Sequence, residues 1–244
     1  FGKGYGEEND FCVRAQEAGW LNLHALDTFV RHAGGVSFGD SKSARELQAM
    51  ETLRRLHPQY DGEVQRFVQD DPARIARLTI DVARIVTAGR PVVLSVTHNR
   101  EGGTLRHIQE LADRLHQHAS FLRLAPVPSG VELRLEGTGE ALALRFVLPQ
   151  EQATLLDVLR RFQVGHIHYH HLLGHRPDIC DLPEQLGVSY DFTAHDFYSY
   201  CPQISLTDHT DRYCGELGLD QCHRCLRRNP APGGEGIESW RDRH

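Results

Sequence analysis

The sequence predicts an α/β fold with a doubly wound sheet in its second half, joined to the first half by helices. A continuous β-branched run at Val92–Val96 is followed at once by a glycine-containing turn and an amphipathic helix, which is how doubly wound domains begin. Segments of period two and segments of helical period then alternate along the chain. Since strands that alternate with helices tend to pair in parallel, we expect a largely parallel sheet.

The first half of the chain carries three helical signals. In residues 1–40, Phe11, Ala15 and Ala18 share a helical face that Gly19 ends. A helix is expected over Ser41–Leu56, with its apolar face formed by Leu47, Met50, Leu53 and Leu56. Another is expected from an N-cap at Asp71 and a proline at Pro72 to Gly89. Residues 41–88 are therefore predicted to form a helical linker.

The second half contains the elements of the sheet. Three strands of alternating pattern are separated by glycine turns, which predicts a small antiparallel meander. A helix through Phe162 and two further strands follow, and the tail over residues 229–236 is expected to be a loop. The expected strands after the first are Phe121–Leu124, Val131–Leu135, Ala141–Leu148, Val164–Tyr169 and Val188–Ala194.

Composition excludes several classes of protein. The 244 residues are 40% hydrophobic and 25% charged, as in globular domains, and the net charge is −6 with acids and bases interspersed. We therefore expect no nucleic-acid partner. The apolar stretches Pro91–Leu94 and Ala141–Leu144 are far shorter than the roughly 20 residues of a membrane span, so no transmembrane segment is expected. The chain opens at Phe1 and has its single methionine at Met50, which suggests an internal fragment.

Three acidic residues lie close together near the start of the chain. Glu7, Glu8 and Asp10 fall within the segment GYGEENDF, and such carboxylates repel one another unless a cation or a hydroxyl ligand lies between them. They are also what the N-terminus of a helix favours, because the helix dipole stabilises negative charge there. From the residues alone, both interpretations stay open.

The order of motifs around these acids resembles the C-terminal end of the GT-A catalytic domain of family-two glycosyltransferases. The matching residues are the acidic segment, Arg14, Gly19-Trp20, and the stretch from His32 to Ser37. The resemblance implies that residues 1–40 are the C-terminal remnant of such a domain. It also implies that Glu8, with Asp10 as the alternative, is the general base, and that His32 helps to hold a divalent Mg or Mn ion on the donor diphosphate.

The second half has two groups of candidate ligand-binding residues. Gly102 and Gly103 lie between a strand and a helix, where backbone N–H groups can bind an anion, although a tight turn would need the same glycines. His166, His168 and His170 fall on one side of a strand. Three histidines on one face could bind a metal, but the end of a strand is also where ligand-contacting residues gather, and we favour a ligand-lined crevice.

Together with the segment Thr193-Ala194-His195-Asp196, these groups look like the N-terminal, acceptor-side domain of a GT-B glycosyltransferase of family four. The resemblance implies a Rossmann-like domain over residues 89–244, whose donor-binding partner domain would follow the chain. It places His195 as a catalytic residue near the donor sugar, and it gives substrate-binding roles to Gly102, Gly103, His168, His170 and Asp196.

Four cysteines lie in a predicted insertion over residues 201–225. Cys201, Cys214, Cys222 and Cys225 have 12, 7 and 2 residues between them, and the final Cys-x-x-Cys is typical of a zinc knuckle. Free thiols or disulfides are the alternatives, and a structural zinc is favoured. Clustering of this kind also favours a reducing, cytoplasmic compartment.

These observations predict a fragment of a glycosyltransferase that transfers sugar from a nucleotide-sugar donor to a glycan acceptor in the synthesis of a polysaccharide or cell-surface glycan. We expect it to be cytoplasmic, with peripheral association at the inner face of the membrane as an option, and to be inactive by itself. One alternative is a zinc-stabilised α/β binding or scaffold domain without catalysis. Another is a metal-dependent hydrolase that uses His166, His168, His170 and Asp196.

Overall fold

The computed structural model describes residues 1, 6–28, 30–31, 42–137, 142–208, 210–215, 218–231 and 234–243. The chain divides into two compact units, Phe1–Ile80 and Asp81–His244, and each is described by itself. Among the described residues, no helix is long and apolar enough to cross a membrane, as the sequence predicts.

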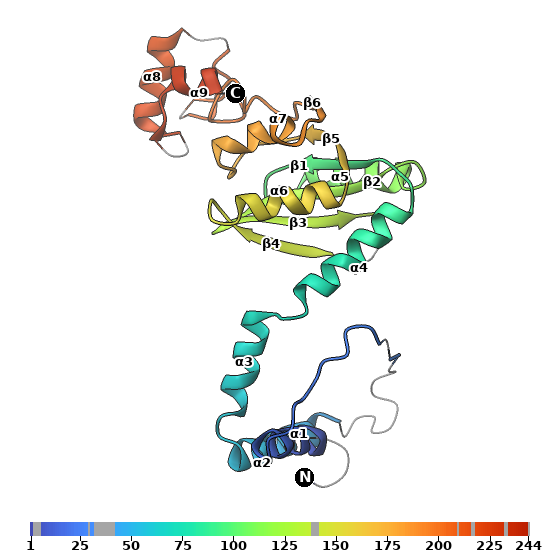
Figure 1. Ribbon diagram of the computed structural model, residues 1–244. Helices are drawn as coiled ribbons and strands as arrows, with labels where there is room; N and C mark the ends of the chain where they lie inside the picture. The colour runs from blue at the N-terminus through green and yellow to red at the C-terminus, as the bar shows by residue number, and fades with distance from the viewer. Residues whose placement is uncertain are drawn as a thin grey trace. The chain divides into compact units, whose positions relative to one another are not determined.

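The first unit is helical. It contains α1 (Glu7–Glu17), α2 (Lys42–Leu56), α3 (Tyr60–Asp70) and the beginning of α4 (Arg74–Thr87), which continues into the second unit (Figure 1). The helices expected at α1 and α2 are confirmed, but their apolar faces are partly wrong. Phe11 and Leu47 are exposed, whereas Val13, Ala49 and Leu53 are buried.

The expected N-cap at Asp71 is wrong. Asp71 has a left-handed backbone (φ 40°) and ends α3, a helix that the sequence analysis did not predict. Its backbone N–H donates to the carbonyl of Phe67, and its carbonyl accepts from the N–H of Arg74, where α4 begins. One residue therefore ends the first helix and turns the chain into the second.

The second unit is built on a six-stranded mixed sheet, which confirms the α/β class. The strands lie in the order β4-β3-β2-β1-β5-β6, with parallel pairing of β1 to β2, of β1 to β5 and of β5 to β6. The meander is also confirmed, because β2, β3 and β4 pair antiparallel. The bounds are β1 Val92–Val96, β2 Ser120–Val127, β3 Gly130–Glu136, β4 Ala143–Val147, β5 Val164–Tyr169 and β6 Ser189–Phe192.

The helices α5 (Gly103–Leu115) and α6 (Gln152–Arg161) flank this sheet (Figure 1). Their apolar faces are buried together with the strands, each such side chain contributing about 1.5–3 kcal/mol. The fully buried side chains include Leu94, Ile108, Leu122, Leu124, Leu133, Leu155, Leu159 and Ile167. The order of the strands puts β1 between β2, which follows it in the chain, and β5. The order of successive strands across the sheet therefore reverses at β1, and ligands bind beside the carboxyl ends of the strands at such a reversal.

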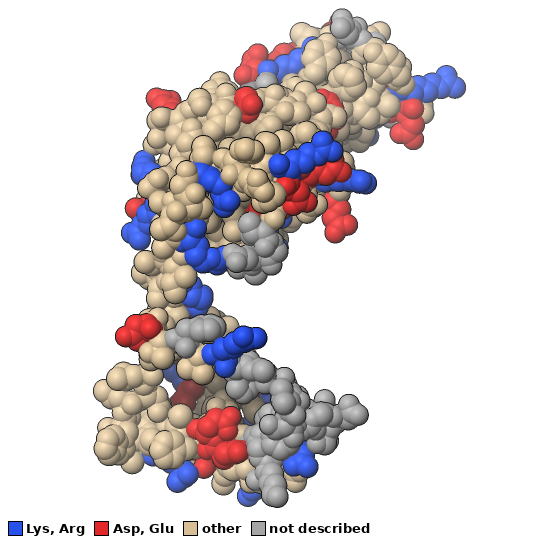
Figure 2. Space-filling model, turned by 90° about the vertical axis from the view of Figure 1, so that its right-hand side faces the viewer, with Lys and Arg blue, Asp and Glu red and all other residues tan. Residues whose placement is uncertain are grey.

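A 3₁₀ helix (Pro177–Asp181) and α7 (Leu182–Leu186) connect β5 to β6, and α8 (Leu219–Arg228) and α9 (Ile237–Arg243) follow the last strand. Trp240 of α9 is fully buried, and its indole N–H donates to the carbonyl of Tyr198 at 2.7 Å. This anchor fixes the last helix to the chain that leaves β6. On the face drawn in Figure 2, basic and acidic side chains are mixed, as their interspersion in the sequence predicts.

Candidate functional site

Histidines gather at the carboxyl edge of the parallel strands. His98 follows β1, His170 and His171 follow β5, and His195 follows β6. Backbone hydrogen bonds hold the carboxyl ends of β1 and β5 together, because the N–H groups of His170 and His171 donate to the carbonyl of Val96 at 2.8 and 3.3 Å. Four of the residues proposed for the site, His168, His170, His195 and Asp196, lie at or shortly after the ends of β5 and β6.

The glycine loop lies at the same edge, between β1 and α5. Gly102 has φ 139° and ψ −162°, a conformation that is essentially restricted to glycine. It is the N-cap of α5, and no side chain among the described residues caps the helix there. The first N–H groups of α5 are thus available to an anionic group, whereas Gly103 has an ordinary φ.

Asp196 holds His171 in one tautomer. The N–H of Leu173 donates to Nδ1 of His171, so the ring proton is on Nε2, which donates to the Asp196 carboxylate at 3.2 Å. The second carboxylate oxygen accepts the N–H of Tyr198 at 2.8 Å. Both oxygens of Asp196 are therefore engaged within the protein, and the residue acts here to position its neighbours.

The predicted histidine row is only partly continuous. The rings of His168 and His170 stack with centroids 3.9 Å apart, and His168 Nε2 hydrogen-bonds to the hydroxyl of Thr193 at 2.7 Å. His166 instead contacts Ser189 Oγ and Asp191, at 2.8 and 3.1 Å, along β6. His168 and His170 thus belong to the edge, while His166 is tied to the neighbouring strand.

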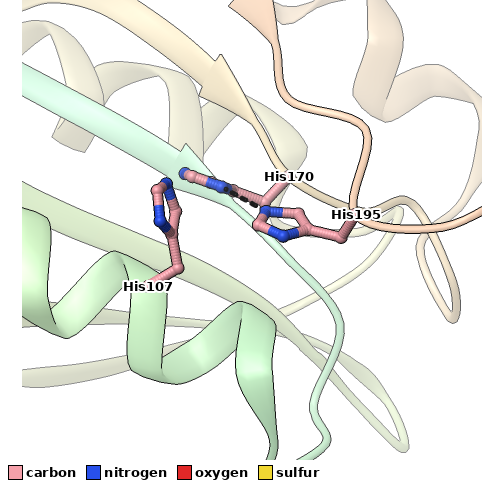
Figure 3. Close-up of side chains that lie close together, drawn as sticks. All are labelled: His107, His170 and His195. Atoms are coloured by element: carbon pink, nitrogen blue, oxygen red, sulfur yellow. Dashed lines mark hydrogen bonds between the residues drawn. The ribbon is translucent and has the colours of Figure 1, made fainter.

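Three imidazoles converge at the centre of this edge. Figure 3 shows His107, which points from α5 toward His170 and His195. One ring nitrogen from each lies within 4.8 Å of the other two. Among the described residues, no other three metal-ligating side chains lie so close together. His170 Nδ1 and His195 Nε2 are 3.1 Å apart. Sequence reasoning missed His107, although its place in the first turns of α5, after the glycine loop, was a usable signal.

Buried polar atoms without partners lie on β1, directly after it, and on the segment that follows β5. Ser95 Oγ, Thr97 Oγ1, His170 Nε2 and His175 Nδ1 are all buried, with no hydrogen-bond partner among the described residues. Each such atom costs on the order of 1–3 kcal/mol when nothing satisfies it. Unpaired groups of this kind call for a bound ion, ligand or water.

Burial also sets the charge of these histidines. It lowers the pKa of His170 to about 3 and that of His175 to about 4, because the charged imidazolium loses solvation. Burial likewise lowers the pKa of His168 and of His195, and neighbouring histidines lower it further. The edge therefore presents neutral imidazoles near pH 7, with lone pairs available to accept a proton or bind a metal.

An apolar cavity of about 340 Å³ lies beside the edge. Aromatic side chains of β5, β6 and the following segment form its walls, and His171 packs against one of them, Tyr198, with ring centroids 4.3 Å apart. Apolar walls with a few polar groups are typical of small-molecule sites. The lining residues are Tyr169, Leu172, Cys180, Tyr190, Phe192, Tyr198 and Ser199.

The four predicted zinc cysteines are all described, and none is in a disulfide. Burial raises the pKa of Cys201, Cys214 and Cys225, and neighbouring thiols of the same set raise it further. The thiols are thus near one another, but no three of them lie within 4.8 Å. A structural zinc there stays a prediction.

The residues expected from the family-two resemblance lie in the first unit. Glu8 is exposed in the first turn of α1. The Asp10 carboxylate accepts from His57 Nε2 at 2.8 Å and from Arg14 at 2.9 Å, and these hydrogen bonds lower its pKa. His32 lies outside the described residues. Among the described residues of this unit, no three metal-ligating side chains lie within 4.8 Å of one another.

Comparisons with known proteins identify no relative. No family model matches the chain, and no match was found among curated proteins or solved structures.

Proposed function

We propose that the second unit is a sugar-transfer domain that binds its substrates at the carboxyl edge of β1, β5 and β6. The observation that carries the proposal is the contact of α5, which begins at the Gly102 loop, with His195: the ring centroids of His107 and His195 are 5.3 Å apart, at the place where the strand order reverses. The fold alone is shared by many activities, so the proposal depends on the site.

Each part of the edge suits one part of a nucleotide-sugar or glycan. The uncapped N-terminus of α5 fits a phosphate group. His195 is partly exposed and neutral, so it can accept a hydrogen bond from a sugar hydroxyl. The cavity walled by Tyr190 and Phe192 offers flat apolar faces for a sugar ring.

Binding of a panel of UDP-sugars, GDP-sugars and soluble oligosaccharides, measured by calorimetry, tests this proposal. We expect at least one member to bind, and His195→Ala to weaken its binding about tenfold, equivalent to ~1.4 kcal/mol. The matched control is His118→Ala, an exposed histidine at the opposite end of α5, which should leave the affinity unchanged. Absence of binding, or equal affinity in His195→Ala, would contradict the proposal.

The first unit carries a separate proposal of the same class. We propose that Glu8 is the general base of a family-two-like sugar transfer, because its carboxylate is exposed whereas Asp10 is paired. The associated Mg or Mn ion and the cytoplasmic or membrane-peripheral location are proposals of the same kind. Glu8→Gln, assayed in a protein that carries out the transfer, should abolish it, while Glu7→Gln should not.

A further inference from the structure

We propose that His107, His170 and His195 bind a divalent transition-metal ion of the zinc class at the carboxyl edge of the sheet. The three side chains come from α5, from the end of β5 and from the segment after β6, so the fold assembles them from distant parts of the chain. The inference does not depend on sugar transfer.

The spacing of the nitrogens fits such an ion. Zinc–nitrogen bonds of about 2.0–2.1 Å in a tetrahedral site put the ligand nitrogens roughly 3.3 Å apart. His170 and His195 already present nitrogens 3.1 Å apart, and His107 lies within 4.8 Å of both. His107 is exposed on its helix, so a rotation of its side chain can shorten the remaining distances.

The state of His170 is the second observation. Its side chain is 1% exposed, and its Nε2 has no hydrogen-bond partner among the described residues. A cation between His170 Nδ1 and His195 Nε2 would bind a lone pair of each ring and leave the ring proton of His170 on Nε2. Stacking on His168, which Thr193 holds by a hydrogen bond, fixes the orientation of the His170 ring.

The donor set selects the class of metal. Neutral imidazoles suit Zn²⁺, Co²⁺, Ni²⁺ and Cu²⁺, whereas Mg²⁺ and Ca²⁺ require oxygen ligands. The nearest carboxylate on the same segment, Asp196, is engaged by His171 and Tyr198. Three protein ligands leave a further position for water or for a substrate oxygen, as in catalytic rather than structural zinc sites.

Zinc content of the full chain, measured after loading with Zn²⁺ and removal of unbound metal, tests this inference. His107→Ala and His195→Ala should each bind one zinc fewer than the unsubstituted chain, and His118→Ala should bind the same number. His107 is exposed, so its substitution leaves the core intact, and circular dichroism of each variant verifies that it is folded. If His195→Ala unfolds, the result for His107→Ala decides.

Cobalt distinguishes this site from the cysteine cluster. Co²⁺ bound by imidazoles gives visible d–d bands without the near-ultraviolet sulfur-to-metal charge transfer that thiolate ligands add. We expect His107→Ala to lose d–d absorption while the charge-transfer intensity stays the same. Equal zinc content in His107→Ala and the unsubstituted chain, or loss of all bound metal in Cys222→Ser alone, would overturn the inference. Because the readout is metal content, failure here leaves the sugar-binding proposal standing, and the reverse also holds.

Discussion

His170 and His195 are 25 residues apart in the sequence, yet a nitrogen of one ring lies 3.1 Å from a nitrogen of the other. The parallel pairing of β5 and β6 favours this contact, since both strands end at the same edge, with His170 directly after β5 and His195 shortly after β6. His107 reaches the pair from α5. The strand order therefore builds the candidate site.

Replacement of Gly102 by alanine tests the glycine loop. The residue has φ 139°, so a side chain there strains the backbone, and we expect a loss of about 1–3 kcal/mol in the free energy of unfolding. Gly103→Ala is the matched control, because Gly103 has an ordinary φ and an added Cβ would have no neighbour within 4 Å. Urea unfolding measures both variants, and equal stability of the two would contradict this description of the loop.

Asp196→Asn tests the link between β6 and the end of β5. The amide cannot accept from both His171 Nε2 and the N–H of Tyr198 in the way that the carboxylate does, and His171 is buried. We expect a loss of about 1–3 kcal/mol in stability. Asp191→Asn, at a residue that is 61% exposed, should change stability by less than about 0.5 kcal/mol. Thermal unfolding of the two variants makes the comparison.

Acid should destabilise the second unit through His175. Burial lowers the pKa of this ring to about 4, below its unfolded value of about 6.5, so between these pH values the unfolded chain binds the extra proton. The stability is complete above about pH 6.5 and falls by at most about 1.4 kcal/mol per pH unit down to about pH 4.

The matched variant is His175→Gln, whose amide can still donate to the carbonyl of Thr97, as the ring does at 2.8 Å, but cannot titrate. Urea unfolding in the presence of a chelator, at several pH values, should give a shallower dependence for this variant. An unchanged slope would assign the acid sensitivity to other groups.

The cysteine segment is expected to bind one structural zinc. Cys225→Ser should lose that ion and loosen the segment over residues 201–225, while Cys12→Ser, at an exposed thiol in the first unit, should not. Metal analysis and limited proteolysis measure the two effects. Full zinc content in Cys225→Ser would favour free thiols. Loss of partner binding in a still-folded cysteine variant would favour the scaffold alternative.

The sheet was predictable because its signals are local. Each strand is a short apolar or alternating run between turns, and Val92–Val96 with the glycines after it defines the first parallel unit. His168 and His170 could be proposed from the same reasoning, since residues at strand ends meet at one edge. His195 was proposed from the resemblance to a GT-B domain.

Other features depend on tertiary contacts that the sequence alone does not specify. Helix α3 has Val64, Phe67 and Val68 at helical spacing, but it buries none of its residues, so no strong core pattern marks it. His107 looks like any exposed residue of a helix until α5 is packed beside the ends of β5 and β6. The buried face of α1 is set by Val13 rather than by the larger Phe11, since the position of a partner decides which face is covered.

The central claim is that substrate binds at the carboxyl edge of the parallel strands, and mapping of amide chemical shifts in a ¹⁵N-labelled sample tests it most directly. Titration with the nucleotide-sugar or glycan that binds best should shift the amides of residues 98–104, 168–171 and 193–196. Amides near His118, at the opposite edge, should stay in place. Shifts confined to the opposite edge, or the absence of shifts with every member of the panel, would contradict the claim.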